Sequence, residues 1–184
     1  MSQVGFFTRW RVRLGYPVAV VALVFAHPTP SSLLYGTIIG LSGLLLRAYA
    51  AGYLSKQEVL TTCGPYAYTR NPLYLGSALL TVGVAVGTNS WLSSLLLCGY
   101  FAVFYSAVMY REQEDLRLRY GVLFEAYSQA VPVFLPRWSA AKLGPACQAS
   151  FSIVRYKKNR EYRAGIGFLL LLVILLVVWR LRLA

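Results

Sequence analysis

The chain has 184 residues, of which 58% are hydrophobic and only 13% are charged, and its formal net charge is +12. An ordinary soluble domain has about 45–50% apolar and about 25% charged residues, so a soluble globular fold and a basic nucleic-acid-binding module are both disfavoured. A disordered chain is excluded, because so much apolar surface would not stay solvated. The composition therefore predicts a small, basic, integral membrane protein.

Five apolar segments are predicted to be transmembrane helices of a single integral membrane domain, residues 1–184. A span needs about 20 mostly apolar residues, with a lower limit near 17. The fourth segment reaches this length outright and the second does so if Arg47 is tolerated; the other three borrow flanking residues whose long side chains reach the interface. A signal peptide is the alternative interpretation of the first segment. The predicted fold is an all-α polytopic membrane bundle, with spans at about 12–27, 33–54, 72–88, 91–110 and 164–180.

Residues 111–163 form the only sizeable polar region and carry ten Lys or Arg. Charges alternate with apolar residues over 111–127, which predicts an amphipathic helix that continues from the fourth span. Pro132 and Pro136 then interrupt the chain. The basic stretch 150–163 is interpreted either as a helix lying on an anionic membrane surface or as a solvated linker.

The distribution of Lys and Arg among the short loops predicts the orientation of the bundle. Three Arg precede the first span, the loop 27–32 has no Lys or Arg, and the loop 55–71 contains Lys56 and Arg70. We therefore expect the N-terminus, the loop 55–71 and the segment 111–163 on the cytoplasmic side. The Arg residues after the fifth span then lie outside, a conflict that a last helix that does not fully cross would remove.

Small residues inside the predicted helices favour close helix packing, because they let two backbones approach. The residues concerned are Gly36, Gly40, Gly43, Gly83 and Gly87, whose spacing does not match a dinucleotide-binding fingerprint. A single histidine, His27, and three cysteines without CxxC spacing predict no metal site.

A rigid, aromatic loop precedes the third predicted span. Its sequence is GPYAYTRNPLYLG, residues 64–76, with two Gly, two Pro, three Tyr and one Arg. Asn71 is well placed as a helix N-cap and Pro72 as the first helical residue. The motif is interpreted either as a helix start with interfacial tyrosines or as a cofactor wall with exposed backbone N–H groups.

Acidic residues cluster where the fourth predicted span ends. The segment 111–115 holds three of the six acidic residues of the chain. One interpretation is a solvated helix surface on which Glu112 or Glu114 pairs with Arg117 or Arg119. The other is a carboxylate at the membrane boundary that binds a cation or takes a proton.

Arg47 lies in an otherwise apolar helix, where a charged group needs a partner or a route to water. Three interpretations are open for it. The side chain reaches the interface, it pairs with Glu112, or it binds an anionic group of a ligand.

The two clusters resemble the isoprenylcysteine carboxyl methyltransferase and phospholipid methyltransferase superfamily of membrane enzymes. That family has a GPY…R[HN]P.Y.G stretch, then a helical hairpin, then EE..L…[FY]G..[YF]..Y…V. Here the first part is residues 64–76, and the second begins at Glu112-Gln113 and continues through Leu116, Tyr120-Gly121, Phe124 and Tyr127 to Val131-Pro132. The resemblance covers residues 47–137, about half of the chain, and both motifs agree in order and spacing.

The resemblance implies S-adenosylmethionine as methyl donor, bound in a cytoplasm-facing pocket between the third and fourth spans and the tail. It implies a lipophilic acceptor that enters from the bilayer, and a segment near Phe124–Pro136 that closes over the pocket. Arg70 and Glu112 are the candidate catalytic residues. Arg70 would hold the carboxylate of the donor, and Glu112 would hold its ammonium or lie beside the acceptor. Tyrosines would stack on adenine or face the sulfonium. The candidate donor-binding residues are Gly64, Pro65, Tyr66, Tyr68, Arg70, Asn71, Pro72, Tyr74, Gly76, Glu112 and Tyr127.

Two positions depart from the family pattern. Asn71 stands where the isoprenylcysteine enzymes usually have His, and Gln113 replaces the second acid of the Glu-Glu pair. Because the loss of an acid weakens the case for removing a proton from an amine, a carboxylate or thiolate acceptor is favoured. The resemblance also implies a multi-pass protein of the bacterial inner membrane, with lipid-like partners and neither a nucleic-acid nor a metal partner.

Three alternatives remain open. One is a phospholipid N-methyltransferase. The second is a membrane reductase of the sterol-reductase kind, with NADPH in the equivalent place and Arg117, Arg119 and Arg137 near its 2′-phosphate. The third is a non-catalytic membrane adaptor.

Overall fold

The computed structural model describes residues 3–55, 59–141 and 150–183, with side chains from residue 13 onward. In these ranges the chain forms helices and no strand, which confirms the all-α prediction. The elements are α1 (Gln3–Val24), α2 (Pro30–Tyr53), η1 (Gly64–Ala67), α3 (Pro72–Thr88), α4 (Trp91–Tyr120), α5 (Val122–Ala130), α6 (Ile153–Lys158) and α7 (Tyr162–Leu183).

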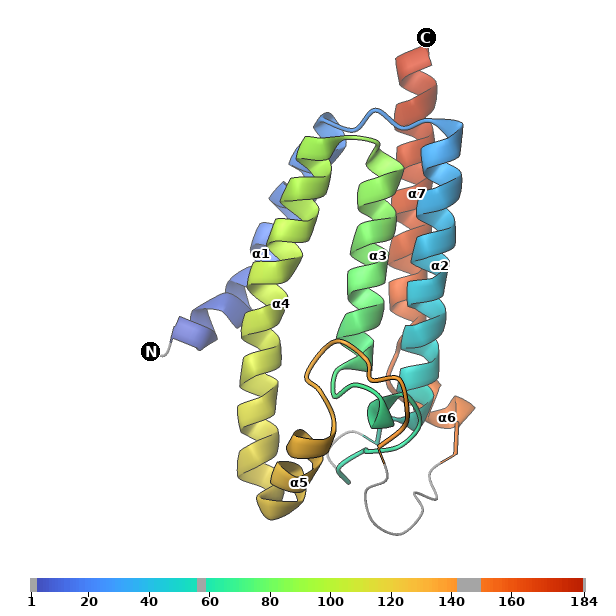
Figure 1. Cartoon of the computed structure of the whole chain (residues 1–184). Coiled ribbons are helices and arrows are strands. Elements are labelled where there is room, and N and C mark those ends of the chain that lie inside the picture. The colour runs from blue at the N-terminus through green and yellow to red at the C-terminus, as the bar shows by residue number, and fades with distance from the viewer. Residues whose placement is uncertain (1–2, 56–58, 142–149, 184) are drawn as a thin grey trace.

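The long helices α1, α2, α3, α4 and α7 make up the body of the molecule (Figure 1). The short elements η1, α5 and α6 gather at one end, where α2 ends and α3 begins. We call this the motif end, and we call the end that carries the α1–α2 and α3–α4 connections the opposite end. The two motifs of the sequence therefore meet at the same end of the bundle.

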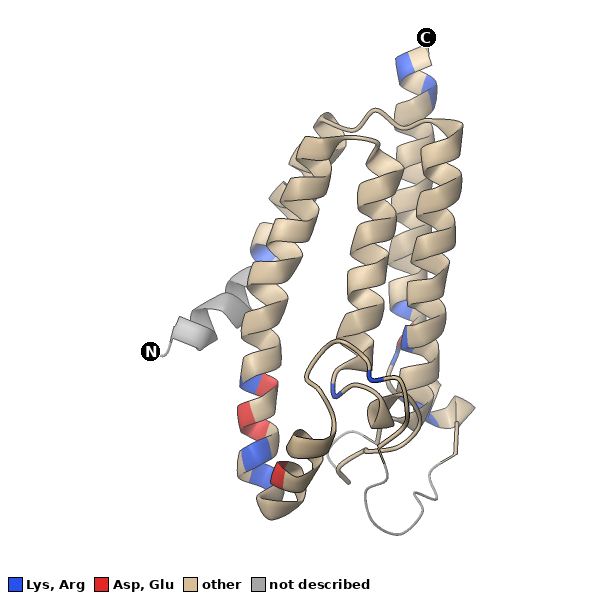
Figure 2. Cartoon of the chain, viewed as in Figure 1, with Lys and Arg blue, Asp and Glu red and all other residues tan. Residues whose placement is uncertain are grey.

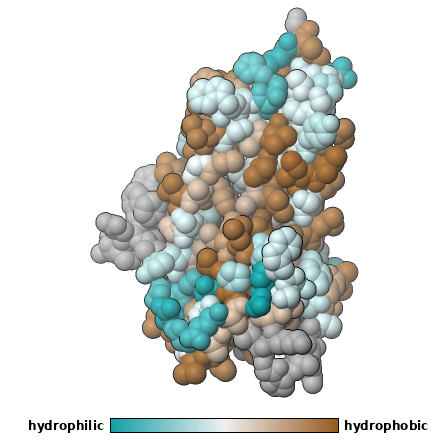
Figure 3. Space-filling view, viewed as in Figure 1, coloured by the Kyte–Doolittle hydropathy of each residue, from teal (hydrophilic) through white to brown (hydrophobic). Residues whose placement is uncertain are grey.

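The helical body has the composition of a membrane protein. Among the described residues, α2, α4 and α7 are long and apolar enough to cross a membrane, whereas Arg13–Val24 of α1 and the 17-residue α3 are shorter. The acidic residues drawn lie toward the motif end, and most of the basic ones lie toward one end of the bundle or the other (Figure 2). On the face in view, hydrophilic side chains likewise gather at both ends and hydrophobic ones lie between them (Figure 3). Three spans are thus supported, and the crossing of α1 and α3 remains a prediction.

Helices α2 and α3 touch through their backbones. A Cβ atom added at Gly36 would lie 2.5 Å from the carbonyl oxygen of Gly83, and one at Gly43 would lie 2.6 Å from that of Gly76. A backbone carbonyl does not yield as a flexible side chain does, so these positions require glycine. The predicted close packing through small residues is confirmed, and it fixes α2 against α3, the helix in which the first motif ends.

Local signals end the helices at the opposite end. Asn89, with φ of 50°, closes α3 in the left-handed region, and the Ser90 side chain accepts a hydrogen bond from the backbone N–H of Ser93 at the start of α4. The Ser93 hydroxyl donates to the carbonyl of Ala22 at 2.7 Å and joins α1 to α4. Only Asn89 and Ser90 separate α3 from α4, in agreement with the bounds predicted for the third and fourth segments.

One prediction for the polar region is wrong in detail. The amphipathic helix does not continue through 111–127, because Gly121 adopts φ of 49° and ψ of −123° and separates α4 from α5. The stretch 150–163 contains the six-residue helix α6, and its location on a membrane surface remains a prediction. Its Arg155 donates to the carbonyl of Gly52 at 2.8 Å, and Asn159 donates to that of Ala51 at 2.9 Å. This segment satisfies the last carbonyls of α2, which a helix end leaves without internal partners.

Candidate active site

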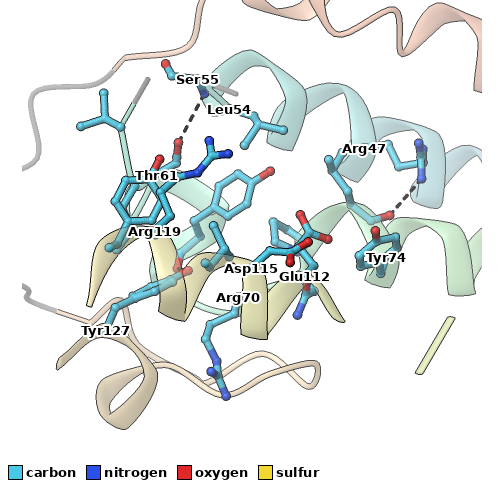
Figure 4. A pocket seen from close by; sticks show the side chains of 18 of the residues that line it. Arg47, Leu54, Ser55, Thr61, Arg70, Tyr74, Glu112, Asp115, Arg119 and Tyr127 are labelled. Atoms are coloured by element: carbon cyan, nitrogen blue, oxygen red, sulfur yellow. Dashed lines mark hydrogen bonds between the residues drawn. The ribbon is translucent and has the colours of Figure 1, made fainter. Parts of the chain in front are cut away.

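A cavity of about 560 Å³ lies at the motif end. Small-molecule sites typically measure about 300–1,000 Å³, so the cavity has the size of a ligand pocket. Its wall is made by the end of α2, residues 59–61, η1, the first turns of α3, the charged part of α4, Tyr127 of α5 and Glu161. Figure 4 shows side chains from these elements around one space.

The first motif folds as a tight turn against its surroundings. Gly64 has φ of +56°, and a Cβ atom there would lie 2.7 Å from the ring of Tyr53. The Thr69 hydroxyl donates to the carbonyl of Phe134 at 2.8 Å, and the Asn71 side chain donates to that of Val133 at 2.8 Å. Asn71 holds the N-cap position of α3, but its side chain makes no capping hydrogen bond and instead ties the motif to the later segment.

The second motif packs directly onto the first. The Tyr127 hydroxyl donates to the carbonyl of Tyr66 at 2.8 Å, and the backbone N–H of Arg70 donates to the carbonyl of Pro132 at 2.9 Å. Tyr127 forms a buried apolar cluster with Phe124 and Val131. Burial raises the pKa of the Tyr127 hydroxyl, and the Arg70 guanidinium opposes that effect. The segment Phe124–Pro136 thus packs against the motif loop, and its expected closure over the pocket remains a prediction.

Seven of the eleven candidate donor-binding residues line the cavity. They are Tyr66, Arg70, Asn71, Pro72, Tyr74, Glu112 and Tyr127. Gly64, Pro65, Tyr68 and Gly76 do not. Tyr68 is 40% exposed, and Gly76 faces α2, where a Cβ atom would lie 2.8 Å from the carbonyl oxygen of Gly43. These four residues shape the motif, and the ligand-binding roles of all eleven remain predictions.

The Tyr66 hydroxyl is buried in the cavity wall without a hydrogen-bond partner in the described part of the chain. The residue is only 7% exposed. Burial raises the pKa of this hydroxyl well above its usual value, and the carboxylates of Glu112 and Glu161 add to the effect. An orphaned buried hydroxyl is costly, so this one marks a position where a ligand would supply the missing partner.

Glu112 presents an unpaired carboxylate to the cavity. It makes no hydrogen bond or ion pair with residues 13–55, 59–141 or 150–183, and Figure 4 shows it beside Asp115. Glu114 instead pairs with Arg117 at 3.0 Å, and Arg117 also reaches Glu125 at 2.7 Å. The surface-pair interpretation therefore holds for Glu114 and not for Glu112.

Arg70 is held by the residue that departs from the family pattern. Its guanidinium donates to the side-chain oxygen of Gln113 at 2.5 Å and lies 5.9 Å from the centre of the Phe124 ring. Its Nε atom is buried and unpartnered among the described residues. Figure 4 shows Arg70 extending away from the carboxylates of Glu112 and Asp115. Burial lowers the pKa of Arg70. Because Gln113 is neutral, it orients this cation without cancelling its charge.

Arg47 pairs with Glu161 and not with Glu112. The two charged groups are 2.6 Å apart, with side chains 18% and 10% exposed, and both line the cavity. Arg47 also donates to the carbonyl of Leu73 at 3.1 Å and to the Ser77 hydroxyl. The pairing of Arg47 with Glu112 is therefore wrong. The Arg47 side chain is bound inside the protein and does not extend to the membrane interface.

Sequence reasoning missed Glu161, although a signal for it existed. Glu161 is the only acidic residue after Glu125, and it stands among the cations of 150–163. An Arg inside an apolar helix needs a counter-charge, and each isolated acid in the chain was a candidate for that role. Tyr105 was also missed; it lines the cavity and meets the Tyr74 ring edge-on, with ring centres 5.7 Å apart.

The chain is similar to a known protein family and to two resistance proteins. The sequence pattern of the phospholipid methyltransferase family matches residues 39–122. The chain is 32% identical over 147 residues to the nickel-cobalt-cadmium resistance protein NccN of Alcaligenes xylosoxydans xylosoxydans, and the alignment covers 73% of this chain and 68% of that protein. It is 31% identical over 139 residues to the cobalt-zinc-cadmium resistance protein CzcN of Cupriavidus metallidurans, covering 71% of this chain and 63% of that protein.

A third relative is an enzyme. The chain is 30% identical over 82 residues to the protein-S-isoprenylcysteine O-methyltransferase of Schizosaccharomyces pombe, covering 45% of this chain and 35% of that protein. The chain thus spans about two thirds of the length of the two resistance proteins and about a third of the yeast enzyme. No solved structure matches it.

Proposed function

The chain belongs to the superfamily of isoprenylcysteine carboxyl methyltransferases and phospholipid methyltransferases, and from that premise we propose that it transfers a methyl group from S-adenosylmethionine to a lipophilic acceptor at the membrane. One observation carries the proposal. Both motifs line a single cavity that holds the unpartnered Tyr66 hydroxyl and the unpaired Glu112 carboxylate. A polar ligand with a cationic group fits that arrangement.

The lining of the cavity matches the chemistry of the donor. S-adenosylmethionine carries a sulfonium, an ammonium, a carboxylate and an adenine ring. In our proposal Glu112 binds the ammonium and Arg70, through its free Nε, binds the carboxylate, both by charge-assisted hydrogen bonds. The aromatic rings of Tyr74 and Tyr105 offer faces for the sulfonium or the adenine.

The residues of the chain act by alignment and by exclusion of water. When bound, S-adenosylmethionine supplies a methyl group whose bond to sulfur breaks as an acceptor lone pair forms the new bond, leaving a neutral thioether. Such an in-line displacement depends on holding the two reactants in register. The contact of Tyr127 with the carbonyl of Tyr66 fixes the wall against which the donor would lie.

The nature of residue 113 supports an anionic acceptor. A neutral amide does not take a proton, so Gln113 offers no base for an amine. A carboxylate or a thiolate is already deprotonated and needs none. Tyr105, which is the lining residue of α4 furthest from the motif end, places the inner part of the cavity beside the apolar body of the bundle. We propose that a lipid-like carboxylate or thiol enters there from the bilayer.

Binding experiments separate this function from its alternatives. The purified protein is titrated in detergent with S-adenosylhomocysteine and, separately, with NADPH. We expect heat with the first ligand only. Heat with NADPH alone would support a reductase, and heat with neither at millimolar concentration would contradict both enzymes. Transfer of labelled methyl to an isoprenylated cysteine analogue, compared with a phosphatidylethanolamine vesicle, then distinguishes a carboxylate from an amine acceptor.

We also propose that the motif end faces the cytoplasm, because Lys and Arg concentrate in its loops. Single cysteines are introduced at Thr62, Ser139 and Ser31 in a background without other cysteines. A membrane-impermeant reagent on the cytoplasmic side should label the first two positions, and only reagent on the other side should label Ser31. Labelling of Thr62 and Ser31 from the same side would contradict the topology.

A second candidate function is a role in metal resistance, which the identity to the two resistance proteins favours. Those proteins are named for nickel, cobalt, zinc and cadmium, and we propose that methyl transfer by this chain contributes to such a resistance. The test compares growth of cells with the intact gene, without it, and with Glu112→Gln, on graded cadmium. Equal growth of all three strains would contradict the role.

A further inference from the structure

Charged side chains are distributed unevenly around the cavity. Arg47 and Arg119 lie on opposite sides of it, with Glu112 and Asp115 between them (Figure 4). On the Arg47 side, the Tyr66 hydroxyl lies within the electrostatic reach of one guanidinium and of the carboxylates of Glu112 and Glu161. These three charged groups, two negative and one positive, carry a summed charge of about −1.

The net charge of these three groups depends on Glu161. Arg47 is mostly buried, and its Nε atom has no hydrogen-bond partner in the described part of the chain, so its charge is compensated chiefly by the carboxylate 2.6 Å away. A buried cation that loses its partner keeps its charge and acts on every ionic group nearby. Without Glu161, Arg47 and Glu112 would remain of the three, and their summed charge would be about zero.

We infer that Glu161 is a positioning residue for a cationic ligand: by neutralising Arg47, it leaves the Glu112 carboxylate free to attract positive charge into this corner. The inference rests on the proposed function and deepens it, because it assigns a ligand-selecting role to a residue outside the matched range 39–122. The segment before α7 thereby completes a site that the two motifs begin.

The arrangement explains why an ion pair lies in a ligand-sized cavity. Arg47 supports the start of α3 through the carbonyl of Leu73 and the hydroxyl of Ser77. A guanidinium in that place would repel a sulfonium if it stood alone. Glu161 lets the chain keep the structural contacts of Arg47 while removing this repulsion.

A pair of ligands with different charge tests the inference. S-adenosylmethionine carries a net charge of +1 at neutral pH, and S-adenosylhomocysteine, which lacks the sulfonium methyl, is neutral overall. Affinities for both are measured by calorimetry for the wild type and for Glu161→Gln, which keeps the shape of the side chain. Unit charges about 10 Å apart at an effective dielectric constant near 20 change affinity about tenfold. We expect Glu161→Gln to weaken the binding of S-adenosylmethionine about tenfold more than the binding of S-adenosylhomocysteine.

A second variant should change the ratio of the two affinities in the opposite direction. Arg47→Met removes the cation and leaves Glu112 and Glu161 both unpaired, so the preference for the charged ligand should increase over the wild type. In the double variant with both Arg47→Met and Glu161→Gln, the corner regains a net charge of about −1, and the preference should return to the wild-type ratio. The ratio of two affinities is insensitive to a general loosening of the site, and it remains measurable if one variant fails to fold.

Glu125→Gln is the matched control, because Glu125 also pairs with an Arg, at 2.7 Å, but at an exposed position outside the cavity wall. It should leave the ratio unchanged. Equal weakening of both ligands by Glu161→Gln, or a ratio that does not move in opposite directions in the two single variants, would overturn the inference while leaving the proposed function in place. Failure of the wild type to bind either ligand would overturn both.

Discussion

The two ends of the bundle are built in different ways. At the opposite end, neighbours in the sequence cap the long helices: Thr29 and Ser32 form a reciprocal capping box at the start of α2, and Ser90 caps α4. At the motif end, Asn71 makes no such capping hydrogen bond at the start of α3, and distant residues bind there instead, from Tyr127 to Tyr66 and from Asn159 to Ala51. Long-range hydrogen bonds occur at both ends, as from Ser93 to Ala22, but local caps at the starts of long helices are found at the opposite end.

The hollows at the two ends differ in charge. Among the described residues, those that line an open depression of about 510 Å³ at the opposite end are uncharged. The described residues that line the cavity at the motif end include three Arg, two Glu and one Asp. The two ends therefore differ most clearly in the placement of charge, which is what a site that recognises a charged ligand requires. The following changes test that distinction.

The largest expected effect is on the packing that joins the two ends. Gly36→Leu places a side chain against the carbonyl of Gly83, where a Cβ atom alone would lie at 2.5 Å. We expect α2 and α3 to separate, with a loss of about 3 kcal/mol or more in the free energy of unfolding. Thermal unfolding in detergent measures it. Gly99→Leu is the control, because nothing lies within 4 Å of a Cβ atom there; equal losses in both variants would contradict the packing.

The next effect is on the long-range contacts of the motif end. Tyr127→Phe removes the hydroxyl that donates to the buried carbonyl of Tyr66. An unsatisfied buried acceptor costs about 1–3 kcal/mol, so the unfolding temperature should fall, and affinity for the donor should fall with it. Tyr110→Phe, at a residue that is 62% exposed, should change neither. A Tyr127→Phe protein with normal stability would show that this contact does not hold the motif in place.

A smaller effect is expected for a cap at the opposite end. Thr29→Ala removes the side chain that accepts from the backbone N–H of Ser32 at 3.1 Å. The loss should be about 1 kcal/mol in the free energy of unfolding, with no change in donor affinity. Thr29→Ser keeps a hydroxyl and should recover most of the stability. A change in donor affinity on Thr29→Ala would break the separation between the two ends.

The same contrast explains which features the sequence predicted. The boundary between α3 and α4 and the packing through Gly36 and Gly83 follow from short-range patterns, and both were predicted correctly. Tyr66, Arg70 and Glu112 were placed together by the motifs, and they do line one cavity.

The errors lie where distant segments decide the outcome. The partner of Arg47 is 114 positions away, and no local pattern distinguishes Glu161 from Glu112 as that partner. The residues next to Asn159 in the sequence likewise do not indicate that its side chain caps α2. That contact depends on the path of the chain after α5. The alternation of charged and apolar residues over 111–127 predicted one continuous helix. It contains no information on the backbone angles of Gly121, whose positive φ interrupts that helix.

The most direct test of the central claim is the affinity of the motif-end cavity for S-adenosylmethionine in the wild type and in Glu112→Gln. Glu112 makes no hydrogen bond or ion pair in the described part of the chain, so the variant should unfold at the wild-type temperature. Loss of a charge-assisted hydrogen bond to the donor should weaken binding by about 1–3 kcal/mol, roughly 5- to 150-fold. Normal donor affinity in a stable Glu112→Gln protein would contradict the assignment of this cavity as the donor site.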